Sequence, residues 1–331
     1  MEEGFRLWAN PSSPHAEGRA ARRALEDARA RVKRALEWDG EVIFTSGASE
    51  ALWIALNRAK AERRIVSAVE HDAVFRAAPD AAVLPIRQYG AEPDPDALAE
   101  ALAHNGPAVF ALQAINSETG TELLKARSNH SRGLAQQVRN RGWLLLVDCS
   151  QSAGKQPLPD ADMIVVSAHK FGGPIGIGAL LVRDYAILKP VGGHERGYRQ
   201  GTENLPGAIG MAAALEAGGL DSWTTSEADR LDFRQAIWAQ GEGIVVGPQC
   251  SHIFAVAHPA LSAQALLIRL DAAGFAVSAG SACSSGTLKR SRALAGFGVP
   301  EDVAARTIRV SLGWNTTAEE LERFVEVWGA L

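Results

Sequence analysis

Several classes of protein are excluded by what this 331-residue sequence lacks. Its three cysteines, Cys149, Cys250 and Cys283, are sparse, odd in number and without CxxC spacing. We therefore expect neither a disulfide framework nor a zinc or other metal site. The apolar runs, such as Trp143–Val147, are far shorter than the roughly 20 residues that a membrane-spanning helix needs. The formal net charge of −4 shows no basic excess, which argues against direct binding of nucleic acid.

The N-terminal segment Met1–Arg6 has neither a basic region nor an apolar stretch of the kind found in secretion signals. We therefore expect a cytoplasmic protein, in which a single well-placed cysteine can stay reduced and act as a nucleophile. Hydrophobic residues make up 47% of the chain, which is enough to bury a core and excludes a disordered protein.

Short apolar segments alternate with helical ones through the first two thirds of the chain. This alternation predicts an α/β fold, a mainly parallel sheet with helices on both faces. Helices are expected near residues 16–37 and 50–63. The expected strands are Glu41–Thr45, Ile65–Val69, Ala108–Ile115, Trp143–Val147, Met163–Ser167 and Ala179–Val182.

The pattern changes after about Leu220, where a smaller α+β unit is expected. Its helices are predicted at residues 226–240, 263–273, 291–295, 301–305 and 318–328. Its strands are predicted at Gly243–Val246, Ile253–Ala257, Phe275–Ser278 and Ile308–Ser311.

Polar residues follow the strands of the larger unit. They are Ser49, His71, Asn116, Asp148, Ser167, His169 and Lys170. Ligands of open α/β sheets bind beyond the carboxyl ends of the strands, so we expect these side chains to line one edge of the sheet.

Asp148 and Lys170 are the pair that points to a cofactor. A lysine with a lowered pKa can form a Schiff base, and a carboxylate can keep a pyridinium nitrogen protonated, as pyridoxal phosphate (PLP) requires. Taken singly, Asp148 is better explained as a helix cap and Lys170 as a surface residue, and only the pair favours a cofactor. Likewise, Gly47–Ser49 before a helix could bind a phosphate, but taken alone it fits an ordinary N-cap better.

Ten short motifs occur in a colinear order over nearly the whole chain. They are Asn10–His15, Phe44–Glu50, Glu70–His71, Asn116–Gly120, Val147–Ser152, Ser167–Lys170, Gly192–Gly197, Arg199–Asn204, Ser278–Cys283 and Ile308–Gly313. With them the sequence resembles a cysteine desulfurase of the class V aminotransferase family. The long stretch between Cys283 and Arg309 is similar to the NifS/IscS-like group rather than to the SufS-like group.

The resemblance implies a PLP-dependent transferase of fold type I. Residues 1–220 would form a large PLP-binding domain with a mainly parallel seven-stranded sheet flanked by helices. Residues 221–331 would form a small C-terminal α+β domain that carries Arg309 and the loop of Cys283. The resemblance also implies a homodimer, in which Thr202 would reach the phosphate bound by the partner subunit.

Roles for the site residues follow from the resemblance alone. Lys170 would hold PLP as a Schiff base, and Cys283 would be the nucleophile that takes sulfur from L-cysteine. Arg309 would bind the substrate carboxylate. The other cofactor contacts would be Ala48, Ser49, Ser167 and His169 at the phosphate, Asp148 at the ring nitrogen, Gln151 and Asn116 near the ring hydroxyl, Asn116 also near the substrate, and His71 stacked on the ring as an acid or base.

Two differences from the family pattern leave alternatives open. The segment before residue 15 looks shortened, and the chain ends one helix after Arg309, which puts docking to an iron–sulfur scaffold protein in doubt. The expected product is a Cys283 persulfide for an acceptor protein, in iron–sulfur cluster assembly or sulfur modification. The alternatives are a selenocysteine lyase or another class V lyase or aminotransferase, and a regulatory paralogue with impaired catalysis.

Overall fold

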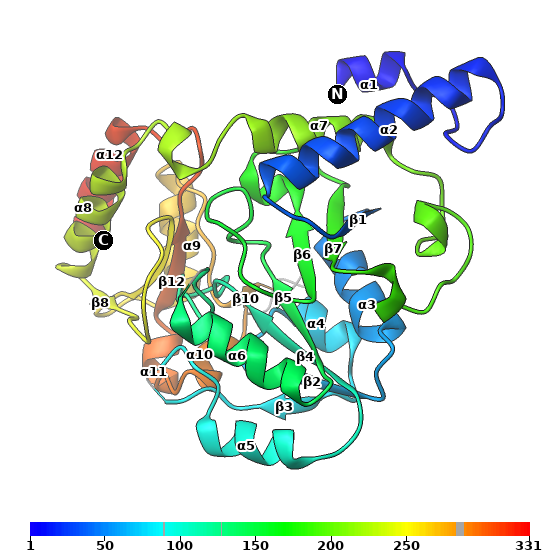
Figure 1. Ribbon diagram of the computed structural model, residues 1–331. Helices are drawn as coiled ribbons and strands as arrows, with labels where there is room; N and C mark the ends of the chain where they lie inside the picture. Colours follow the sequence, from blue (N-terminus) through cyan, green and yellow to red (C-terminus); the bar gives the residue numbers. More distant parts are fainter. Residues whose placement is uncertain (89, 127, 283–287) are drawn as a thin grey trace.

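The structure is a computed structural model that describes residues 1–88, 90–126, 128–282 and 288–331. Within this part of the chain the main elements are a seven-stranded sheet and a three-stranded sheet, each with its own helices (Figure 1). A two-stranded pair, β10 (Ser281–Ala282) with β11 (Leu288–Lys289), forms a third, minor sheet. In the described residues no helix combines the length and the apolar character that crossing a bilayer requires.

The seven-stranded sheet has the order β1-β7-β6-β5-β4-β2-β3. Its strands are β1 (Glu41–Thr45), β2 (Arg63–Ser67), β3 (Ala82–Leu84), β4 (Ala108–Gln113), β5 (Leu144–Asp148), β6 (Met163–Ser167) and β7 (Gly178–Val182). Strand β7 runs antiparallel to both of its neighbours, and the other pairs are parallel. The predicted α/β fold with a mainly parallel sheet is therefore confirmed.

Helices cover both faces of this sheet (Figure 1). They are α2 (Ala16–Ala35), α3 (Ala48–Arg58), α4 (Asp72–Ala77), α5 (Pro95–Ala103), α6 (Asn129–Asn140) and α7 (Leu205–Glu216). The short helix α1 (Glu2–Arg6) packs against α7 instead. Alternate strand residues point to opposite layers. Val42 and Phe44 belong to the buried cluster that includes side chains of α2 and α7, whereas Ile43 belongs to the cluster that includes side chains of α3 and α4.

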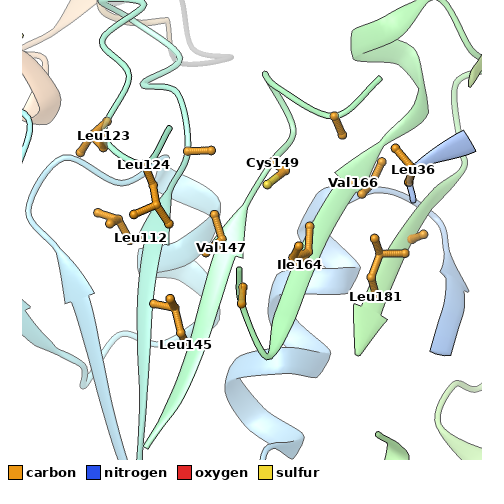
Figure 2. Close-up of a cluster of buried hydrophobic side chains, with 14 of the residues drawn as sticks. Leu36, Leu112, Leu123, Leu124, Leu145, Val147, Cys149, Ile164, Val166 and Leu181 are labelled. Atoms are coloured by element: carbon orange, nitrogen blue, oxygen red, sulfur yellow. The ribbon is translucent and has the colours of Figure 1, made fainter. Parts of the chain in front are cut away.

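The close-up of one buried layer shows the same alternation in the central strands (Figure 2). Leu145 and Val147 of β5 lie beside Ile164 and Val166 of β6. Cys149 is fully buried in this cluster, and burial raises the pKa of its thiol to about 12. The sequence prediction that Cys149 and Cys250 are buried small residues is confirmed, because both are free thiols inside the core.

The three-stranded sheet has the order β12-β9-β8 and is antiparallel. Its strands are β8 (Glu242–Gly243), β9 (Ile253–Ala257) and β12 (Thr307–Ser311). The helices that follow the first two thirds of the chain are α8 (Glu227–Trp238), α9 (Ala263–Ala272), α10 (Arg292–Gly296), α11 (Glu301–Ala304) and α12 (Ala318–Gly329). A separate apolar cluster joins this sheet to α8, α9 and α12. The division of the chain after residue 220 stays a prediction.

The predicted strand at Phe275–Ser278 is wrong. Only Ser278 pairs with another chain segment, through a single bridge to Arg309. The turn at Gly274, with φ of +87°, and the packing of Phe275 edge-on against Phe324 direct this segment into the helix layer instead of along the sheet. Ser278 is thereby left as an isolated partner for the strand that carries Arg309.

Candidate active site

A cavity of about 520 Å³ opens at the carboxyl ends of β4, β5 and β6. The predicted polar residues that line it are Ser49, His71, Asp148, Ser167, His169 and Lys170, together with Ala48, Gln151 and Arg309. Parallel strands end at one edge of a sheet, which is why residues far apart in the sequence meet there. The volume suits a small cofactor with its substrate.

The start of α3 forms one wall of the cavity. Gly47 precedes the helix with φ of +152°, and no side chain of the described residues caps the first turn. The N–H groups of Ala48 and Ser49, which have no acceptor within the helix, are therefore available to an anion. A Cβ at Gly178 would lie 2.8 Å from the Gly47 Cα atom, so a glycine in β7 lets this turn pack against the sheet.

Lys170 lies in a 3-10 turn, Ala168–Phe171, directly after β6. Ser167 Oγ lies 3.1 Å from His169 Nδ1 in the same turn. Burial and the Arg309 guanidinium lower the pKa of Lys170, and the Asp148 carboxylate opposes the shift. A lowered pKa brings the amine closer to its neutral, nucleophilic form.

Asp148 ends β5 and is 8% exposed. Its Oδ1 accepts a hydrogen bond of 2.9 Å from the Ser150 N–H. No hydrogen bond to Oδ2 occurs within the described part of the chain, so that oxygen can accept one from a ring N–H placed in the cavity. A carboxylate at this position suits a protonated pyridine nitrogen.

His71 is the N-cap of α4 and lies at the cavity wall. Its Nδ1 accepts a hydrogen bond of 3.1 Å from the Ala73 N–H. In the neutral ring the proton then sits on Nε2, and burial lowers the pKa of His71, which favours this neutral form. The imidazole thus offers a flat face and a movable proton to the cavity.

Arg309 extends from β12 into the cavity and connects the smaller sheet with the larger one. Its Nη1 donates to the Ser117 carbonyl and its Nη2 to Ser278 Oγ, each at 3.0 Å. Its Nε is buried and has no partner among the described residues, and burial lowers the pKa of the guanidinium. A fixed guanidinium with an unused N–H is suited to an incoming carboxylate.

Two of the predicted site residues, Asn116 and Thr202, do not line this cavity. Asn116 is buried, and its Nδ2 donates to the Val69 carbonyl at 3.0 Å while its Oδ1 accepts from Thr119. Thr202 is exposed on the loop before α7. Cys283 lies outside the described residues. Their roles stay predictions.

Gln113 is a cavity residue that sequence reasoning missed. It ends β4 and is 3% exposed. The signal was present in the sequence, since a polar residue at the end of an apolar strand is the same pattern that singled out Asp148 and Ser167.

Comparison with known proteins identifies the family. The family model for class-V aminotransferases matches residues 2–324. The chain belongs to the class-V aminotransferase family. A curated cysteine desulfurase of Cereibacter sphaeroides is 36% identical over 97% of this chain and 87% of its own length. The cysteine desulfurase IscS of Dictyoglomus turgidum is 32% identical over 97% of this chain and 86% of its own length.

Solved structures support the same fold. The NifS-like protein of Rickettsia africae superposes with a TM-score of 0.84 over 99% of this chain and 94% of its own, at 23% identity. At that identity the likeness concerns the fold. The sequence therefore shows the family, and the architecture confirms the predicted fold type I.

Class-V aminotransferases depend on PLP, and the cavity residues fit this cofactor. The uncapped start of α3, with Ser167 and His169, suits a phosphate. The open Oδ2 of Asp148 suits the ring nitrogen, and Lys170 supplies an amine with a lowered pKa. The three features that PLP needs therefore occur on one cavity.

Proposed function

We propose that this class-V aminotransferase is a cysteine desulfurase, which converts L-cysteine to L-alanine and leaves the sulfur as a persulfide on Cys283. The observation that carries the proposal is the convergence of Lys170, Asp148 and Arg309 on one cavity. The names of the curated relatives, cysteine desulfurases that align over nearly the whole chain, support the choice of substrate.

The residues that would hold PLP divide by the part of the cofactor they bind. Ala48, Ser49, Ser167 and His169 would bind the phosphate, Asp148 the ring nitrogen, Gln151 and Asn116 the ring hydroxyl, and His71 the ring face. Lys170 would hold PLP in the resting enzyme, and the cofactor would supply an electron sink that makes the substrate's Cα proton removable once the substrate amine has taken the place of Lys170 Nζ.

The chain's own groups bind the substrate and move its protons. Arg309 would bind the carboxylate through its unused N–H groups, since Ser117 and Ser278 already fix the guanidinium. The Nζ of Lys170 would accept the Cα proton, which its lowered pKa allows. The Nε2 of His71 would donate or accept a second proton at the same cavity wall.

In the sulfur transfer, one sulfur atom passes from the substrate thiol to the Cys283 thiol, and the atoms and electrons balance. The thiolate of Cys283 attacks the substrate sulfur, an S–S bond forms, and the Cβ–S bond of the substrate breaks. The electron pair of that bond stays with the alanine skeleton, which gains a proton. Cysteine and the Cys283 thiol thus become alanine and a Cys283 persulfide, with no external oxidant.

Three further features belong to the proposal. The enzyme would be a homodimer in which Thr202 of each subunit reaches the phosphate site of the other. The persulfide would pass to a sulfur-acceptor protein for iron–sulfur cluster assembly or sulfur modification. A cytoplasmic location would keep the nucleophilic thiol reduced.

Mass spectrometry of the PLP-loaded protein after incubation with L-cysteine tests the assignment of the nucleophile. We expect one added sulfur atom on the peptide that contains Cys283. Cys149 and Cys250 are internal controls that should stay unmodified, because both thiols are buried. Sulfur on either control peptide, or on none of the three, would refute the assignment.

A further inference from the structure

Glu70 is a buried carboxyl group directly behind the proposed active site. It precedes His71 in the chain and is 3% exposed. Its Oε1 accepts hydrogen bonds from Ser67 Oγ at 2.8 Å and from the Gln113 N–H at 2.9 Å. Its Oε2 is buried and has no hydrogen-bond partner in the part of the chain that the structure describes.

These bonds fasten together two segments of the cavity wall. The ladder between β2 and β4 ends at the pair Val66 and Ala111, before the chain reaches Gln113. Beyond that point, the Glu70 side chain continues the connection by accepting from the Gln113 backbone. The side-chain amides of Gln113 and Asn116 both donate to the Val69 carbonyl, which holds the same turn from the other side.

The surroundings of Glu70 favour the neutral acid over the carboxylate. None of the ion pairs within the described residues involves Glu70, and Asp148 at the end of β5 is a carboxylate neighbour. An unpaired charge in a buried site costs far more free energy than an unpaired O–H group. Burial, assisted by Asp148, raises the pKa of Glu70 to about 8 against the lowering effect of Ser67 and Gln113.

We propose that Glu70 is a positioning residue that acts as a neutral carboxylic acid, holding His71 and Gln113 beside the cofactor without adding a second negative charge next to Asp148. The part that concerns His71 rests on the proposed function of the site. Glu70 does not line the cavity, so its effect passes through the residues it fixes.

Two substitutions of Glu70 test whether a neutral hydrogen-bond acceptor is sufficient at this position. Glu70→Gln keeps an oxygen acceptor for Ser67 and Gln113 and is permanently neutral, so kcat/KM for alanine formation should stay within about threefold of wild type. Glu70→Ala leaves both donors unpaired, and kcat/KM should fall about tenfold or more.

The protonation state is read directly by infrared difference spectroscopy of the full-length, PLP-loaded proteins. Wild type minus Glu70→Gln should show the carbonyl band of a protonated carboxylic acid below pH 8, lost as the pH rises through about 8. If Glu70→Ala does not fold, Ser67→Ala replaces it. That variant removes a hydrogen bond that lowers the Glu70 pKa, so the band should persist to higher pH.

Glu195→Gln is the matched control, because Glu195 is equally buried but pairs with Arg29 at 2.6 Å. It should lower the unfolding temperature and remove no acid band. The proposal is overturned if the difference spectrum of wild type minus Glu70→Gln shows no carboxylic acid band below pH 8. It is also overturned if Glu70→Gln folds but loses as much activity as Glu70→Ala. Absence of alanine from wild type would instead refute the desulfurase assignment and leave the infrared result standing.

Discussion

At the residue scale, the side chains at the cavity already make hydrogen bonds to other parts of the protein. His71 Nδ1 accepts from Ala73, Asp148 Oδ1 accepts from Ser150, and two nitrogens of Arg309 donate to Ser117 and Ser278. Each bond fixes the orientation of the side chain and leaves a different atom for the ligand. Preorganised groups of this kind favour catalysis because they need little rearrangement when the substrate binds.

His71 allows its structural and chemical roles to be separated. His71→Asn retains a side-chain acceptor for the Ala73 N–H, whereas His71→Ala removes the cap and should lower the free energy of unfolding by about 1 kcal/mol. Both variants lack the imidazole, so alanine formation should fall about a hundredfold in each. Urea unfolding and a coupled alanine assay measure the two effects. Normal turnover by His71→Asn would remove His71 from the catalytic groups.

At the element scale, the sequence predicted best the strands that are buried over most of their length. Strands β1, β6 and β9 have the predicted bounds; each residue of β6 and β9 is buried, as are four of the five residues of β1. Strand β3 was missed because it is a three-residue edge strand in which Val83 is 55% exposed. Burial on both faces gives a continuous apolar signal, whereas a short exposed edge gives none.

The glycine of β7 is a specific requirement of the turn before α3. A Cβ at Gly178 would lie 2.6 Å from the Val166 carbonyl oxygen and 2.8 Å from the Gly47 Cα atom. Gly178→Ala should therefore lower the free energy of unfolding by about 1–3 kcal/mol and weaken PLP binding, because the phosphate-binding turn must shift.

Gly133→Ala is the matched control for this substitution. Gly133 is exposed in α6, and nothing lies within 4 Å of the position of its Cβ. Alanine there should raise the free energy of unfolding by about 0.5–1 kcal/mol without changing PLP affinity. Calorimetry and PLP titration distinguish the pair, and equal PLP affinity in both variants would contradict the role given to Gly178.

At the scale of the whole molecule, the site lies where the two main sheets meet. Gln151 lines the cavity, and its carbonyl lies 3.0 Å from Lys155 Nζ and 3.1 Å from Nε2 of His252, which precedes β9. Periodicity identified the strands on each side but gave no sign that Arg309 would reach Ser117. Its place in the site was predicted only by resemblance, because contacts between distant segments are not encoded in local patterns.

The buried His252 should make the stability of the molecule sensitive to acid. Burial lowers the pKa of His252 from 6.5 to about 3, so the unfolded chain binds this proton more tightly than the folded one. The stabilisation is complete above pH 6.5 and is lost as the pH falls toward 3, with a slope of up to about 1.4 kcal/mol per pH unit.

Urea unfolding of the wild type and His252→Gln over this pH range measures the effect. Glutamine can still donate to the Gln151 carbonyl but does not titrate, so its curve should be flatter. Substitution of the exposed His104 by glutamine is the control and should leave the wild-type slope. Identical slopes in wild type and His252→Gln would contradict the account.

The central claim is that this cavity removes sulfur from L-cysteine. The most direct measurement is alanine release from L-cysteine by the purified, PLP-loaded protein in the presence of a thiol reductant, with Cys283→Ala alongside. The account predicts many turnovers for wild type and none for Cys283→Ala, which should still bind PLP. Alanine release at the wild-type rate by Cys283→Ala, or none from wild type with PLP bound, would contradict it.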